Sequence, residues 1–162
     1  MISFRHAASS HVGVVRSGNE DSGYADAHLL VIADGMGGHA AGELASAAVV
    51  AAVCADVSDR PTTVDAFEQW VRNKLDQAHG RIGDLVAEQP ERRGMGTTCT
   101  LLGSVEDALV IAHVGDSRAY RLRDGQLTQL SKDHTYVQAL VDSGKLDPAQ
   151  AMHHPRRNLL LR

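Results

Sequence analysis

VIADGMGGHAAGE, residues 31–43, joins an apolar strand candidate to the start of a helix. Asp34 ends the apolar run, and Gly35, Gly37 and Gly38 follow it before the chain becomes helical. A carboxylate at the end of a strand, followed by residues without side chains, is typical of two kinds of site. One is a loop that cradles a phosphate group, and the other is a seat for a metal ion.

A phosphate loop is disfavoured by the residues that follow the glycines. Residues 37–42 have the glycine spacing of a P-loop, but Glu43 stands where that loop requires lysine and Leu44 where it requires a hydroxyl. The dinucleotide-binding pattern fails as well, because Asp34 would face the pyrophosphate. Both nucleotide sites are therefore disfavoured.

A metal seat agrees better with the residue types. Mg²⁺ and Mn²⁺ prefer oxygen ligands, and the glycines after Asp34 would let a backbone carbonyl join the carboxylate on one ion. Glu20, Asp21 and Asp116 lie where apolar segments give way to polar turns. Strand ends can bring such residues together at one edge of a sheet. Taken alone, each of these stretches also fits an ordinary turn.

Other chemistry-bearing residues have simpler interpretations. His39 and Glu43 stand four residues apart, as a zinc pair would on one helix face, but no third ligand follows at motif spacing. His113 lies inside an apolar strand candidate and is interpreted as a core histidine. Cys54 and Cys99 lack CxxC spacing, so we expect buried reduced thiols and a cytoplasmic location.

Length and composition favour a single globular domain. A chain of 162 residues with 43% hydrophobic content can bury about 70% of the surface that its unfolded form exposes. The net charge is -4 and no basic run gathers, so nucleic acid is not an expected partner. The longest apolar run starts at Leu44 and is too short to span a bilayer, so we expect no membrane segment.

The order of the elements predicts an α+β fold with antiparallel sheets. Helices are expected from about residue 40 to 54, over residues 64–87 and 134–142, and from Asp147-Pro148 onward. Residues 16–23 are expected to form a polar loop. The Asp124-Gly125 pair predicts a hairpin between the last two strands. Strands are expected over residues 3–8, 12–15, 29–33, 97–102, 108–114, 117–123 and 126–130.

Six stretches, in order, resemble the bacterial branch of the metal-dependent protein phosphatases, the type 2C or PPM family. They are R-x-x-N-E-D from residue 16, VIADGMGGHAAGE, GMGTTCT, AHVGDSRAYRL, SKDHTYVQALVDSG and HHPRRN. The resemblance covers nearly the whole chain. It implies a sandwich of two antiparallel sheets flanked by helices, of which residues 1–162 would form the N-terminal portion of a single domain.

The resemblance also implies an activity, which is the hydrolysis of phosphoserine and phosphothreonine in proteins, in opposition to Ser/Thr kinases. Two Mn²⁺ or Mg²⁺ ions would serve as cofactors. Asp34 would bridge them, and Gly35 would offer its carbonyl to one. Glu20 and Asp21 would hold metal-bound waters, and Asp116 would belong to a third, weaker metal position.

The catalytic chemistry implied by the resemblance is consistent with these residues. Two cations about 4 Å apart would lower the pKa of a shared water, which would serve as the nucleophile toward phosphorus. Asp34 and Arg16 would be the catalytic residues, with Arg16 clamping the substrate phosphate. Met36 occupies the place of a histidine found in animal members and cannot donate a proton. Water or another acid would therefore protonate the leaving group.

The C-terminal stretch RRNLLLR has no cap and no polar tail, so we expect the domain to be C-terminally incomplete. In the family, two further aspartates complete the metal sites beyond the matching region. We therefore expect weak metal binding, slow or absent turnover, and exposed sheet edges that allow oligomers. The alternative hypothesis is a non-catalytic phosphatase-like module that binds phosphoproteins or a kinase. Five intact site residues weigh against it.

Overall fold

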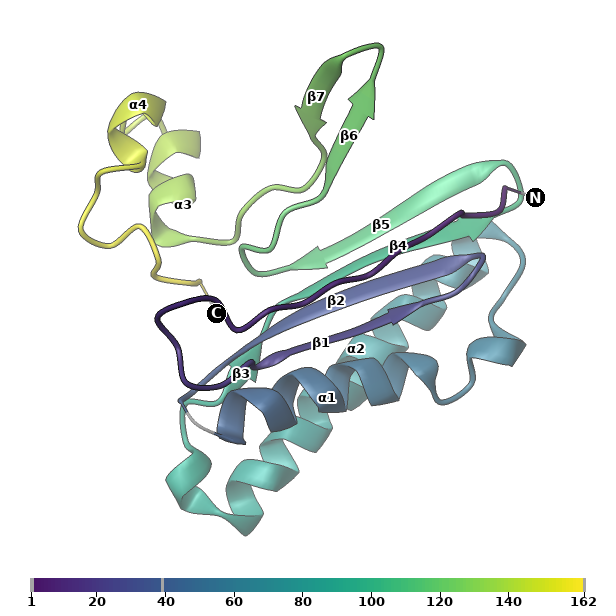
Figure 1. Cartoon of the computed structure of the whole chain (residues 1–162), viewed down its shortest axis with the longest axis horizontal. Coiled ribbons are helices and arrows are strands. Elements are labelled where there is room, and N and C mark those ends of the chain that lie inside the picture. The colour runs from purple at the N-terminus through teal and green to yellow at the C-terminus, as the bar shows by residue number, and fades with distance from the viewer. Residues whose placement is uncertain (1, 39, 162) are drawn as a thin grey trace. The chain divides into compact units, whose positions relative to one another are not determined.

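The computed structural model describes residues 2–38 and 40–161, and the chain divides into two compact units, residues 1–112 and 113–162 (Figure 1). Each unit is described by itself. Five strands of the described chain form one antiparallel sheet in the order β1-β2-β4-β5, with β3 also paired to β2. These strands are β1 (Asp21–Ala25), β2 (Leu29–Met36), β3 (Gly96–Thr97), β4 (Cys99–Val105) and β5 (Ala108–Val114).

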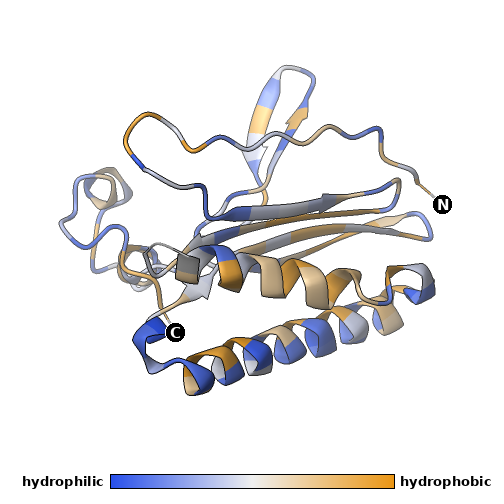
Figure 2. Cartoon of the chain, turned by 60° about the horizontal axis from the view of Figure 1, so that its bottom comes forward, coloured by the Kyte–Doolittle hydropathy of each residue, from blue (hydrophilic) through white to orange (hydrophobic). Residues whose placement is uncertain are grey.

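Two long helices cover one face of this sheet, α1 (Ala40–Cys54) and α2 (Val64–Glu88) (Figures 1 and 2). The short 3₁₀ helices η1 (Val57–Asp59) and η2 (Pro90–Arg92) flank α2. In the hydropathy view α1 is mainly apolar, whereas α2 alternates polar and apolar residues along its length (Figure 2). Helix α1 packs on β1, β2 and α2, as its mainly apolar composition favours.

The core of the first unit lies between the sheet and these helices. Strand β2 alternates buried Leu29, Val31 and Ala33 with half-buried or exposed residues, the period of a strand with one covered face. The Phe67 ring of α2 lies against Gly103 of β4, where a Cβ atom would overlap the ring. Burying each large apolar side chain here contributes roughly 1.5–3 kcal/mol.

The N-terminal strands expected over residues 3–8 and 12–15 are absent from the structure, so this prediction was wrong. The segment is held at separate points instead: Phe4 N donates to Ala27 O at 2.7 Å, and the His28 Nδ1 lies 3.0 Å from Ile2 O. Val14 and Val15 are 99% and 92% exposed. Strand-forming residues gain little without a neighbouring strand to pack against.

A second expectation was wrong at strand β1, because the sequence predicts a polar loop over residues 16–23 and β1 begins at Asp21. All five residues pair with β2 in antiparallel register, from Asp21 opposite Asp34 to Ala25 opposite Leu30. The composition of DSGYA does not favour a strand, so the pairing with β2 decides its conformation. Asp34 accordingly lies within β2 and not after its end.

The second unit contains a hairpin and two short helices. Strands β6 (Tyr120–Arg123) and β7 (Gln126–Gln129) meet at Asp124 and Gly125, whose φ angles of 51° and 76° are those of the predicted two-residue turn. Helix α3 (Tyr136–Asp142) is capped by Thr135, and α4 (Pro148–Ala151) by Asp147. The α+β class with antiparallel sheets is thereby confirmed. Within the described residues, no helix combines the length and apolar character needed to cross a membrane.

Candidate metal centre

Asp34 is exposed on β2, and its main chain is fixed by the adjoining corner between β3 and β4. Its N–H donates to the Thr98 Oγ1 at 3.0 Å, and its carbonyl accepts from Thr98 N at 2.9 Å and from Thr97 Oγ1 at 3.0 Å. Thr98 is buried, so these bonds are shielded from water. The Asp34 carboxylate is therefore carried by a rigid part of the sheet.

Asp21 lies directly opposite Asp34 in the β1–β2 ladder. Opposed residues of antiparallel strands place their Cβ atoms about 4.5–5.5 Å apart on one face, and like charges there are unfavourable. The preceding loop holds Asp21 in place. Ser10 Oγ donates to the Asp21 Oδ2 at 2.7 Å, and Asn19 Oδ1 accepts from Asp21 N at 3.1 Å.

Glu20 lies at the junction of β1, β2 and the first turns of α1. Its carbonyl accepts from Gly35 N at 3.1 Å and from Ser46 Oγ at 2.7 Å. A Cβ atom on Gly42 would overlap the Glu20 carboxylate, and one on Gly35 would overlap the Gly42 carbonyl. The two glycines thus allow the backbones of α1 and β2 to meet, and Gly42 leaves room for the Glu20 carboxylate beside them.

Four of the predicted site residues therefore come together at one corner of the first unit. Their donor atoms are all oxygens, which fits a hard cation such as Mg²⁺ or Mn²⁺ better than zinc. Across the part of the chain that the structure describes, no three Asp, Glu, His or Cys side chains are arranged to hold one ion. The corner supplies part of a ligand set. The four residues are Glu20, Asp21, Asp34 and Gly35.

The other predicted site residues lie elsewhere in the chain. Arg16 is in the loop before β1, and its side chain is exposed. Asp116 is exposed and belongs to the second unit, which is described separately. His39, the first member of the zinc pair considered above, lies outside the described residues.

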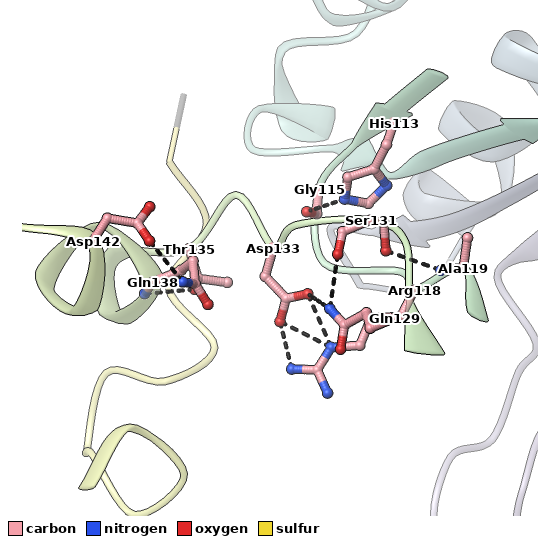
Figure 3. Close-up of polar contacts among 10 residues, drawn as sticks. All are labelled: His113, Gly115, Arg118, Ala119, Gln129, Ser131, Asp133, Thr135, Gln138 and Asp142. Carbon is pink, nitrogen blue, oxygen red and sulfur yellow. Dashed lines mark hydrogen bonds and ion pairs between the residues drawn. The ribbon is translucent and has the colours of Figure 1, made fainter. Parts of the chain in front are cut away.

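The segment that carries Asp116 is fixed on both sides by residues 131–134. Before Asp116, the Gly115 carbonyl accepts from His134 N at 2.8 Å. After it, Arg118 donates to both oxygens of Asp133, with Nε–Oδ1 and Nη2–Oδ2 distances of 2.9 and 2.5 Å (Figure 3). This bidentate bond raises the pKa of Arg118. Asp116 therefore sits on a short segment with little freedom to move.

His113 is half-buried and contacts the same segment, with its Nε2 2.9 Å from Gly115 O (Figure 3). Burial lowers the pKa of His113, and the nearby His134 ring, 5.1 Å away between centroids, lowers it further. A neutral imidazole that donates to a carbonyl agrees with its interpretation as a core histidine.

Three residues that shape this corner were not found from the sequence. Ser46 and Thr98 anchor the backbones of Glu20 and Asp34, and Gly42 lies against the Glu20 side chain. The sequence signal that could have identified them is a hydroxyl residue or a glycine in a mainly apolar segment. Buried polar groups need partners, and these partners lie far away in the sequence.

The sequence profile of a family described as Protein phosphatase 2C matches residues 18–158. The chain belongs to the protein phosphatase 2C family. This confirms the family expected from the ordered motifs, and the match includes the whole of the corner formed by β1, β2 and α1.

Relatives within the protein phosphatase 2C family support the same assignment. The serine/threonine protein phosphatase PstP of Mycobacterium tuberculosis is 48% identical over 162 residues, which cover 98% of this chain and 30% of PstP. The crystal structure of the Mycobacterium tuberculosis phosphatase PstP/Ppp has a TM-score of 0.81 at 47% identity, over 93% of this chain and 63% of that one. This similarity confirms the α+β phosphatase fold.

A second solved structure, the catalytic domain of PstP, is in complex with two manganese ions. It has a TM-score of 0.76 at 45% identity and covers 93% of this chain and 62% of that one. The chain thus spans less than two thirds of the length of each protein phosphatase 2C relative described here, with shares of 30%, 63% and 62%.

Proposed function

We propose that this protein hydrolyses phosphoserine and phosphothreonine in other proteins, with Mn²⁺ or Mg²⁺ as cofactor. The observation that carries the proposal is the direct opposition of Asp21 and Asp34 in a chain of the protein phosphatase 2C family. Two opposed carboxylates repel each other unless a cation lies between or beside them. A relative of 45% identity that holds two manganese ions supports the choice of cation.

The residues of the corner have distinct roles in this proposal. The Asp34 carboxylate would bridge two ions, and the Gly35 carbonyl would bind one of them. Glu20 and Asp21 would accept hydrogen bonds from waters on the ions. Asp116 would contribute to a third position. When bound, the ions supply a water of lowered pKa as the nucleophile that attacks phosphorus.

Arg16 would bind the phosphoryl group of the substrate. A guanidinium can donate two parallel hydrogen bonds to phosphate oxygens, and the Arg16 side chain is exposed, as recognition of a phosphate on another protein requires. Met36 is 46% exposed beside Gly35, and its thioether cannot donate a proton. Protonation of the leaving alkoxide is therefore assigned to water or to another acid.

The partners follow from this chemistry. Phosphorylated proteins are the substrates, and Ser/Thr kinases would generate them. The reduced cysteines, Cys54 and Cys99, favour the cytoplasm as the location. Exposed apolar residues such as Ile32 on the open face of the first sheet would support association with other chains.

The test is phosphate release from a phosphothreonine peptide by the purified chain, with Mn²⁺ and with a chelator. We expect slow release that depends on Mn²⁺ and is lost in Asp34→Asn. The variant Asp84→Asn is the control, because Asp84 is an exposed carboxylate on α2. Release that persists in Asp34→Asn would contradict the proposal. Binding of the peptide without any release and without any dependence on Mn²⁺ would favour the alternative, a non-catalytic module for phosphoproteins or a kinase.

A further inference from the structure

We infer that Gly42, on the first turn of α1, is a positioning residue that fixes the Glu20 carboxylate for its role beside the metal ions. The inference rests on the proposed function and adds a residue to it. Gly42 touches neither substrate nor metal in this account. It acts through the space that its missing side chain leaves for Glu20.

The packing around Gly42 is the first argument. A Cβ atom at this position would overlap the Glu20 Oε2 and would lie 2.7 Å from its Cδ and 2.9 Å from Gly35 C. The Glu20 carboxylate therefore rests directly on the backbone of α1. Any side chain at position 42 would have to displace the carboxylate or move the helix away from β2.

The backbone of Glu20 gives the second argument, because it cannot follow a displaced side chain. Its carbonyl accepts hydrogen bonds from both Gly35 and Ser46, and Ser46 is fully buried on the next turn of α1. With the main chain of Glu20 fixed, the overlap of a Cβ at position 42 with the carboxylate would be relieved by rotation of the Glu20 side chain, and its 2.9 Å approach to Gly35 C by a small shift of the backbone. The carboxylate would leave the corner that it shares with Asp21 and Asp34.

Helix propensity gives the third argument. Glycine is among the poorest residues for a helix and alanine is the best, so α1 alone would be favoured by alanine at position 42. The neighbours in the same turn, Ala40 and Ala41, are alanines. The close approach of Glu20 and Gly35 explains why glycine occupies this one place.

The experiment compares Mn²⁺ binding by isothermal titration in the wild-type chain, Gly42→Ala and Gly80→Ala. Gly80 is the matched control: it lies inside α2, and a Cβ there meets nothing within 4 Å. We expect Gly42→Ala to bind Mn²⁺ about tenfold more weakly, a typical effect of removing support from groups around a metal. Gly80→Ala should bind as the wild type does. Thermal melts establish that each variant is folded.

A double-mutant cycle separates positioning from a general disturbance of the fold. In a Glu20→Ala background the carboxylate is gone and the contact with Gly35 C remains, so Gly42→Ala should cause a much smaller loss of Mn²⁺ affinity than it causes in the wild-type chain. An equal loss in both backgrounds would overturn the inference, as would wild-type affinity in Gly42→Ala. If Gly42→Ala does not fold, Glu20→Asp decides, because it keeps the charge and withdraws the carboxylate. Unchanged affinity in Glu20→Asp overturns the inference.

Failure of the proposed function would look different in the same data. If the wild-type chain binds no Mn²⁺, the metal role of the whole corner fails, and the inference about Gly42 fails with it. If the wild-type chain binds and only the position-42 comparison fails, the proposed function stands without Gly42.

Discussion

Asp21 and Asp34 face each other across the β1–β2 ladder, at the corner where α1 begins. The backbone N–H groups of both residues donate to side chains, that of Asp34 to Thr98 Oγ1 and that of Asp21 to Asn19 Oδ1. Two like charges directly opposite each other destabilise an antiparallel strand pair, so stability of the fold does not explain this arrangement. The arrangement stores repulsion that a divalent cation would relieve.

This opposition predicts that Asp21→Asn stabilises the metal-free chain. Removing one charge removes the repulsion, while the amide oxygen can still accept the hydrogen bond from Ser10. The midpoint of thermal unfolding in a chelator should rise, and the rise should shrink at high salt, which screens exposed charges. In the presence of Mn²⁺ the advantage should disappear. A lower midpoint in the chelator would contradict the repulsion.

A prediction about the core concerns Gly103, which lies under the Phe67 ring. Gly103→Ala should destabilise the chain by roughly 1–3 kcal/mol, because the added methyl overlaps the ring and forces the core to shift. Gly83→Ala in α2 is the matched change in open space and should stabilise by up to about 1 kcal/mol. Urea denaturation measures both. Equal changes in the free energy of unfolding would show that the overlap with Phe67 does not destabilise Gly103→Ala.

The environment of Asp26 predicts part of the loss of folding stability at low pH. Burial by itself would raise the pKa of Asp26, but hydrogen bonds from the His28 and Leu29 N–H groups and from Arg60 outweigh it and lower the pKa. Because the folded pKa is below the unfolded one, the contribution of Asp26 to stability is present above about pH 4 and is lost as the pH falls through the folded pKa.

The variant Asp26→Asn should therefore be less stable than the wild type at pH 7, and its stability should fall less between pH 5 and pH 2. Urea denaturation at a series of pH values measures this. Asp107→Asn, in the exposed turn between β4 and β5, is the control. Parallel pH profiles for Asp26→Asn and the wild type would show that Asp26 carries none of this dependence.

The burial of Cys99 predicts slow alkylation of its thiol. Burial raises the pKa of Cys99 to about 11, so only about one part in a thousand is thiolate at pH 8. Cys54 is half-buried, and its pKa is raised by burial and by Asp26. We expect iodoacetamide at pH 8 to label Cys54 before Cys99 in the folded chain and both equally in urea. Faster labelling of Cys99 would contradict its buried place in β4.

The sequence predicted the parts of the fold whose signals are local. Helix α2 follows from its apolar repeat, and the turn between β6 and β7 follows from Asp124-Gly125. Strand β1 was missed because its residues are poor strand formers and only the pairing with β2 makes it a strand. The N-terminal strands were predicted wrongly because Val14 and Val15 have strand propensity but no neighbour that buries them.

The candidate site also contains residues that local sequence patterns predicted and residues that they did not predict. The glycine-rich stretch pointed to Asp34 and Gly35, and the polar loop before β1 pointed to Glu20. The supports for these residues could not be predicted, because they form where distant segments cross. Ser46 reaches the Glu20 carbonyl across 26 positions, and Thr98 reaches Asp34 across 64.

The central claim is that the corner of Glu20, Asp21, Asp34 and Gly35 binds a divalent cation. Its most direct test is isothermal titration of Mn²⁺ into the wild-type chain, Asp34→Asn and the control Asp84→Asn. We predict binding by the wild type and the control, and loss of binding in Asp34→Asn. Equal binding by Asp34→Asn and the wild type, or no binding by the wild type, would contradict the claim.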